Sequence, residues 1–184
     1  MRWALAPLAV ISLAACGGGD GKADAARPVE PSTSTIATTL KSDRAFGTLE
    51  RVLANAQLDT VLEGAGPYTV FAPSDAAFTA AAVDLGDEAL KAQGAAMLRA
   101  HIVPGALTRA DILAAIDRGG SGKVEMRTMA NSLLTFSKDG GTLIVTGDNS
   151  APARLAGDEM IASNGVVQPI DGLLVRPSAT TAAN

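Results

Sequence analysis

Aromatic residues, cysteine, histidine and clustered cations are all scarce in this sequence. Aromatic side chains make up 3% of the chain, which has one cysteine and one histidine. One cysteine cannot form a disulfide within the chain, and with one histidine it cannot supply the four ligands of a zinc site. Lysine and arginine number 15 against 19 acidic residues and form no basic run, which argues against nucleic-acid binding. We therefore expect no cofactor, no metal and no nucleic-acid partner.

The first residues have the pattern of an export signal. Arg2 precedes an apolar run over residues 3–15, and small residues lead directly into Cys16. This pattern predicts a signal peptide over residues 1–15. The ending Leu-Ala-Ala-Cys resembles the bacterial lipobox, in which the cysteine is acylated, for example with palmitate. The alternative is an ordinary signal peptide that ends beside a chance cysteine. Two or more acyl chains give stable membrane anchoring, whereas one does not.

Residues 16–33 lack the side chains that a packed core needs. They are rich in glycine, alanine, proline and charge, so burial cannot offset the entropy of ordering them. We expect a flexible tether with a reach of about 20–25 Å. Gly17, rather than Asp, follows the cysteine and resembles the outer-membrane sorting pattern of Gram-negative bacteria. The expected location is therefore the bacterial cell envelope, lipid-anchored at the outer membrane or at a periplasmic or extracellular face.

The span 34–177 has the pattern of one globular domain, and residues 178–184 read as a disordered tail. Hydrophobic residues make up 47% of the chain, which is ample for a core. Apolar residues at helical spacing follow Phe46, a helix is expected over residues 87–92, and Thr108 and Asp111 have capping-box spacing. Strands are expected over residues 124–129, 133–136, 143–146, 153–155, 166–168 and 173–175. Helices followed by strands predict an α+β fold.

The few aromatic residues concentrate in one stretch, GPYTVFAPSDAAF, which contains Tyr68, Phe71 and Phe78. An active-site loop and a packing junction between a strand and a helix could both explain this. Residues 68–71 have the composition of a strand that Ala72-Pro73 interrupts, and Ser74 or Asp75 can cap a helix. Such a strand can direct Val70 and Phe71 to opposite sides of a core, with Phe78 covering the junction. The pattern favours packing.

Three segments resemble the conserved blocks of the fasciclin domain. TVFAPSDAAF at 69–78 is similar to the first block, HIVPG at 101–105 to the central Tyr-His block, and SNGVVQPIDGLLVRP at 163–177 to the closing block. The resemblance implies a wedge of short strands packed against several helices. It also implies an extracellular role in adhesion or ligand binding, without general catalytic activity. His101, Asn164, Gly165 and Asp171 match motif positions with a binding or structural role.

Two positions depart from the family pattern. Ala100 stands where the family has the tyrosine before the central histidine, and Gln168 stands where it has a second histidine. Residues around the Tyr-His block have been linked to integrin binding in animal members. With Ala100 in that place, integrin-type recognition is not expected here.

Catalytic motifs are incomplete in this sequence. His101 is the only histidine available as a base, and Ser74 lacks the G-x-S-x-G elbow of a hydrolase nucleophile. GGSGK at 119–123 lacks the first glycine and the Ser or Thr of a phosphate loop. The adjacent carboxylates Asp158 and Glu159 are expected to be solvated, and Asp171 to bind backbone N–H groups at a turn. His101 is expected to be a partly buried ring bonded to backbone.

Together these features predict a membrane-anchored, extracytoplasmic binding module that is not an enzyme. The expected activity is adhesion, with an envelope or matrix polysaccharide or protein as the partner. The alternative is a groove that binds a small apolar ligand such as a lipid or pigment. A hydrolase is a third possibility, which the missing catalytic groups oppose.

Overall fold

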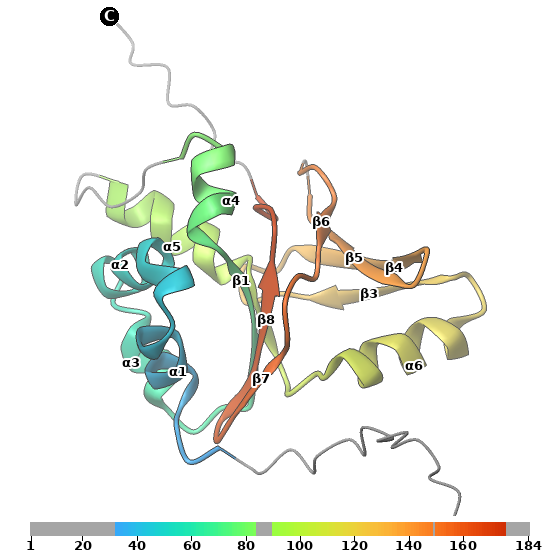
Figure 1. Cartoon of the computed structure of the whole chain (residues 1–184), viewed down its shortest axis with the longest axis horizontal. Coiled ribbons are helices and arrows are strands. Elements are labelled where there is room, and N and C mark those ends of the chain that lie inside the picture. Colours follow the sequence, from blue (N-terminus) through green and yellow to red (C-terminus); the bar gives the residue numbers. More distant parts are fainter. Residues whose placement is uncertain (1–31, 84–89, 149, 176–184) are drawn as a thin grey trace, which may run out of the picture.

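The computed structural model describes residues 32–83, 90–148 and 150–175 as one wedge of two sheets and flanking helices. A central sheet lies between a group of helices on one side and a second sheet with one long helix on the other (Figure 1). The predicted α+β class is confirmed.

Short helices form the N-terminal side of the wedge. They are α1 (Ile36–Ser42), the 3-10 helix η1 (Arg44–Phe46), α2 (Gly47–Asn55), α3 (Asp59–Glu63), α4 (Asp75–Ala80) and α5 (Lys91–Arg99). Side-chain oxygens satisfy the first free N–H groups of α1 and α4, because Thr35 and Ser74 serve as N-caps. Asp75 accepts a hydrogen bond from the Thr48 N–H at 2.7 Å and so ties the start of α4 to α2.

The central sheet has the strand order β2-β1-β8-β7. Its strands are β1 (Tyr68–Pro73), β2 (Ile102–Pro104), β7 (Met160–Ala162) and β8 (Gly165–Ile170). β1 and β8 are parallel although almost a hundred residues separate them, and their register places Val70 opposite Val167 and Phe71 opposite Gln168. The first and closing sequence blocks therefore form the middle of the sheet.

The second sheet is an antiparallel meander in the order β3-β4-β5-β6. It consists of β3 (Lys123–Arg127), β4 (Leu133–Asp139), β5 (Thr142–Thr146) and β6 (Ala153–Arg154). Helix α6 (Arg109–Gly119) packs against it, begins with the predicted capping box of Thr108 and Asp111, and ends at Gly120 in the left-handed conformation.

The core lies on both faces of the central sheet. Val70, Ala72 and Val167 face the helices, where Phe78 joins the same cluster. Phe71 faces the second sheet and stacks on Phe136, with ring centroids 5.1 Å apart. The aromatic stretch is therefore a packing junction, as predicted.

Several elements differ from the sequence prediction. β1 continues through Pro73, because a proline at the end of a strand needs no donor for the next ladder bond. β7 was not predicted, since three residues carry too little pattern. Residues 173–175 form an irregular bend instead of a strand. Helix α5 begins at Lys91, and residues 87–89 of the predicted 87–92 helix lie outside the described residues.

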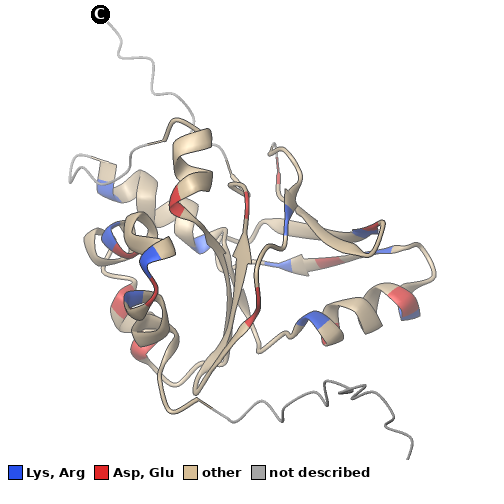
Figure 2. Ribbon diagram, viewed as in Figure 1, with Lys and Arg blue, Asp and Glu red and all other residues tan. Residues whose placement is uncertain are grey.

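Charged residues of both signs are interspersed over helices and strands (Figure 2). Within residues 32–83, 90–148 and 150–175, none of the helices combines the length and the apolar character that crossing a bilayer requires.

Candidate functional site

His101 lies at the junction of α5 and β2 and is fully buried. Its Nδ1 is 2.8 Å from the Met97 carbonyl oxygen, and its Nε2 accepts a hydrogen bond from the Leu174 N–H at 3.0 Å. The Leu174 donor fixes the tautomer, so Nδ1 carries the proton and donates to Met97. Burial lowers the His101 pKa from 6.5 to about 4. Both ring nitrogens are occupied by backbone, which leaves none for a substrate.

Asn164 also serves the backbone alone. Its side-chain oxygen accepts from the Ile36 N–H at 2.8 Å, and its amide nitrogen donates to the carbonyls of Leu62 and Gly64, both at 2.7 Å. The buried amide thereby joins the start of α1, the end of α3 and the β7–β8 turn. Gly165 follows with φ at +152°, and a Cβ there would lie 1.8 Å from the Tyr68 carbonyl oxygen. These two motif residues occupy structural positions.

The other predicted residues are distributed over several elements. The Asp171 carboxylate is exposed and accepts a hydrogen bond from the Arg154 N–H at 2.6 Å. Tyr68 is half-buried against the helix-side core, whereas Phe71 and Phe78 are buried. Ala100 is buried at the C-terminal end of α5. Cys16 lies outside the described residues.

A polar cluster that the sequence did not predict surrounds the start of α6. Arg109 donates from Nε to the Gln168 side-chain oxygen at 3.1 Å and from Nη2 to the Ala156 carbonyl at 3.2 Å. Gln168 is fully buried, and its amide donates to Leu107 O at 3.1 Å and to Glu159 Oε2 at 2.8 Å. Glu159 also accepts from the Arg109 backbone N–H at 2.8 Å.

The expectation that Glu159 is simply solvated is therefore wrong. Its carboxylate closes the first turn of α6, where the unpaired N–H groups of a helix favour a negative charge. Asp158, its neighbour, is exposed as expected. Only Gln168, a polar residue inside the apolar run VVQPI, signalled this cluster in the sequence. Arg109 and Glu159 are 50 residues apart, and no local pattern connects them.

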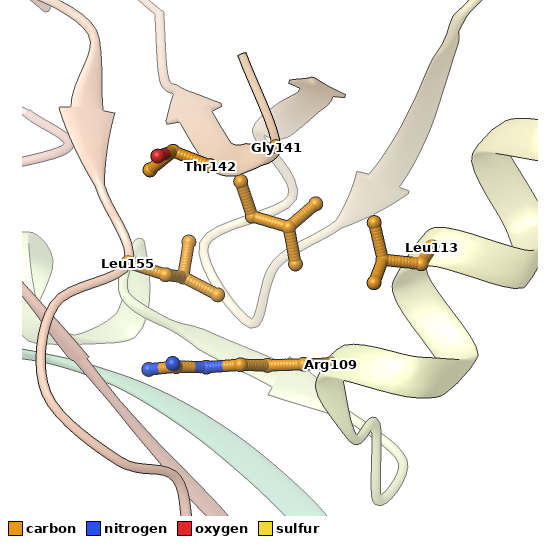
Figure 3. Close-up of a pocket in the computed structure, with 6 residues that line it drawn as sticks. Arg109, Leu113, Gly141, Thr142 and Leu155 are labelled. Carbon is orange, nitrogen blue, oxygen red and sulfur yellow. The ribbon is translucent and has the colours of Figure 1, made fainter. Parts of the chain in front are cut away.

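Arg109 forms one wall of a pocket of about 240 Å³. The other lining residues are Leu113 on α6, Leu155 after β6, and Gly141, Thr142 and Leu143 at the β4–β5 turn. Figure 3 shows the flat arginine side chain on one side of the pocket, with Leu113 and Leu155 directed toward the same space. One cation beside three leucines suits a small ligand that has an anionic group and an apolar surface.

A larger hollow of about 450 Å³ lies between η1 and the segment from Ala156 to Met160. Phe46, Met160 and Ile170 supply apolar surface, and Asp43, Asp158 and Asp171 stand among the lining residues. Ser74 also lines it, but its hydroxyl accepts from the Ala77 N–H at 3.3 Å as a helix cap. Among the described residues, no three His, Cys, Asp or Glu side chains lie close enough together to hold a metal ion.

Helices on one side of a mixed central sheet, with an antiparallel meander on the other, define a fasciclin-type α+β wedge. The same fold occurs in a FAS1 domain pair from the insect cell adhesion molecule Fasciclin I, with a TM-score of 0.67 and 17% identity. That match covers 78% of this chain and 51% of the insect chain. The sequence model of the fasciclin domain matches residues 44–176. The chain therefore belongs to the fasciclin domain family, as its motifs indicated.

Three proteins with similar sequences show what share of a relative's length this chain matches. Mouse Stabilin-1 is 31% identical over 160 residues, which cover 80% of this chain and 6% of Stabilin-1. Pig transforming growth factor-beta-induced protein ig-h3 is 30% identical over 155 residues, which cover 81% of this chain and 20% of that protein. Protein sll1483 of Synechocystis is 29% identical over 150 residues, which cover 79% of this chain and 76% of that protein. The chain thus corresponds to a small part of the two animal proteins.

Proposed function

We propose that the protein is a membrane-anchored, extracytoplasmic adhesion module that binds an envelope or matrix polymer and catalyses no reaction. The observation that supports this most is the state of its one histidine. The ring is fully buried, and both nitrogens are bonded to backbone. A general base must reach the proton that it abstracts, which His101 cannot do from this position. Membership of a family that includes an insect cell adhesion molecule supports the same proposal.

Adhesion through such a module is weak at each site and gains strength from many copies. A tether anchored at Cys16 would let each domain search the space near the membrane and raise the effective concentration of paired contacts. The test compares the full chain on liposomes with an unanchored form that begins at residue 16 and carries Cys16→Ser. Both are assayed for retention on envelope material. We expect strong retention of the liposomes and weak retention of the unanchored form; equal, negligible retention of both would refute adhesion.

The anchor itself has a separate test. Cys16→Ser in the full gene should release the protein from the membrane fraction or stall its processing. Mass spectrometry of the wild-type N-terminal peptide should show the added acyl chains. Unchanged membrane retention of the variant, with no acyl mass on the wild type, would refute the lipid anchor without bearing on adhesion.

A second candidate function is binding of a small apolar ligand in the larger hollow. Its volume of about 450 Å³ and its apolar lining by Phe46, Met160 and Ile170 support this candidate. The test is extraction of the purified full chain with organic solvent, followed by mass spectrometry. A stoichiometric lipid or pigment that Met160→Asp removes would favour this function over adhesion. Extracts without such a ligand would count against it.

A further inference from the structure

The guanidinium group of Arg109 is held in a fixed orientation. Nε donates to the Gln168 side-chain oxygen and Nη2 to the Ala156 carbonyl, so two points fix the plane. Gln168 is itself fully buried and held by Leu107 O and Glu159. A planar donor fixed in this way loses little conformational freedom when it binds a ligand. The cluster therefore pre-organises a cation at the pocket wall.

The positive charge of Arg109 has no ion-pair partner among the residues that the structure describes. Glu159, the carboxylate nearest in the hydrogen-bond network, accepts from the Arg109 backbone N–H and from Gln168, and not from the guanidinium. Within the described part of the chain, Nη1 also has no hydrogen-bond acceptor. Arg109 is half-buried, so this end of the fork can still reach a ligand from solvent. Carboxylates and phosphates are the groups that such a fork binds with strong, charge-assisted hydrogen bonds.

We infer that the pocket over Arg109 binds the carboxylate of an acidic sugar, a uronate unit of a polysaccharide. This inference rests on the proposed function, because it names the partner of the adhesion module. The volume of about 240 Å³ is below the range of pockets for drug-sized ligands, so the occupant must be small, of the size of a single sugar unit. Leu113, Leu143 and Leu155 offer apolar surface to the C–H groups of the ring. The one positive charge of Arg109 equals the one negative charge of a uronate carboxylate.

The test measures binding of a fluorescently labelled oligogalacturonate to the full chain in detergent, by fluorescence anisotropy. The matched probe is the same oligosaccharide with its carboxylates methyl-esterified, which keeps the ring and removes the charge. We expect saturable binding of the acid, at least about tenfold weaker binding of the ester, and weaker binding as salt screens the charge. Equal affinity for acid and ester would overturn the inference.

Two sets of variants locate the site. Arg109→Gln should weaken binding of the acid by about tenfold or more, as expected for loss of a charge-assisted pair. Thr142 lines the pocket, and the structure gives its side chain no hydrogen bond, so Thr142→Glu and Thr142→Lys change the local charge without disturbing Arg109. The glutamate should weaken binding and the lysine should strengthen it. Thr60→Glu, at an exposed position of α3, is the control and should leave binding unchanged.

The outcomes separate this inference from the adhesion proposal. If both Thr142 variants bound the acid with wild-type affinity, the pocket assignment would be overturned, even if Arg109→Gln failed to fold. Inorganic phosphate that displaces the probe as well as free galacturonate does would overturn the sugar assignment and leave a simple anion site. No binding of the oligosaccharide, while liposomes still adhere to envelope material, would refute only the uronate inference. Loss of both would refute the proposed function as well.

Discussion

Two polar regions of the molecule use buried side chains in opposite ways. In the closed region, His101 and Asn164 direct all their polar atoms at backbone groups of their own fold. In the open region, Arg109, Gln168 and Glu159 form a network whose guanidinium still has donors beside a pocket. His101 and Gln168 are equally buried, but His101 contacts backbone groups alone, whereas Gln168 contacts the guanidinium that lines the pocket. The distinction lies in what the polar atoms contact.

The two regions also differ in whether their residues match the motifs of the family. The closed region is made of residues that match fasciclin motifs, and it joins helices to the central sheet. The open region includes Gln168, which replaces the second histidine of the family pattern. The motif residues His101 and Asn164 are thus structural, whereas Gln168, which departs from the motif, lies in the network beside the candidate binding pocket. The predictions below test that contrast, from the largest expected effect to the smallest.

The largest effect is expected from Gly165→Ala in the closed region. The new Cβ would lie 1.8 Å from the Tyr68 carbonyl oxygen and 2.9 Å from Ile36 Cδ1, so β1 and β8 could not keep their register. We expect a loss of more than about 4 kcal/mol in the free energy of unfolding, or failure to fold. Gly119→Ala at the end of α6 is the matched control, since its Cβ meets no atom closer than 4.0 Å. Urea unfolding measures both; a tolerated Gly165→Ala would contradict the assigned packing.

Acid should destabilise the closed region through His101. Its native pKa of about 4 lies below the ordinary histidine value of 6.5, so the unfolded state binds more protons between these values. Stability is therefore complete above about pH 6.5 and falls as the pH decreases toward 4, by about 3 kcal/mol. The pKa of Asp111 is also lowered, chiefly by its hydrogen bonds to Thr108, but its effect begins only below its ordinary value of 3.8.

The matched variant for this pH effect is His101→Gln, which keeps a polar side chain that does not titrate. Denaturant unfolding of both proteins across pH 4–7 should show a flatter stability profile for the variant. The variant should also be less stable at neutral pH by about 1–3 kcal/mol, because one ring contact to backbone is lost. An equal slope in both proteins would assign the acid sensitivity to other groups.

In the open region, Gln168→Leu should affect both stability and binding. The change removes the acceptor of Arg109 Nε and the donor to Leu107 O and Glu159, which should lower the free energy of unfolding by about 2 kcal/mol. Arg109 would then lose one of its two fixed points, so retention on envelope material should also decrease. A variant that loses stability but binds as the wild type does would show that Gln168 is structural only.

The smallest effect on stability is expected from Arg109→Lys. Lysine keeps the charge but cannot reproduce the planar fork, so binding should weaken. Loss of one of the two side-chain hydrogen bonds of Arg109 should lower the free energy of unfolding by about 1 kcal/mol. Thermal unfolding and retention of the liposome-displayed chain measure the two effects. Full retention by the lysine variant would indicate a general charge effect in place of a positioned guanidinium.

The sequence allowed prediction of the elements that local chemistry determines. The cap of α6, its stop at Gly120 and the opposite orientations of Val70 and Phe71 follow from patterns within a few residues. The three-residue strand β7 and the bend at residues 173–175 could not be predicted, because both depend on distant partners. Leu174, for instance, is fixed by a hydrogen bond to His101, 73 residues away in sequence.

The candidate site was harder to predict than the fold for the same reason. Its hydrogen bonds join α6 to β8 across 59 residues and to the segment before β7 across 50 residues. Glu159 looked like an ordinary surface carboxylate beside Asp158, and Arg109 like an ordinary first residue of a capped helix. The parallel pairing of β1 with β8 places Gln168 beside this helix start, and no short pattern encodes that pairing.

The most direct test of the contrast between the two regions is a paired measurement on His101→Gln and Arg109→Gln. Each variant is displayed on liposomes at a temperature where it is folded and assayed for retention on envelope material, and its unfolding midpoint is measured in parallel. We predict that folded His101→Gln keeps retention although its midpoint is lower, whereas folded Arg109→Gln loses retention. Loss of retention in folded His101→Gln, with full retention by Arg109→Gln, would contradict the account.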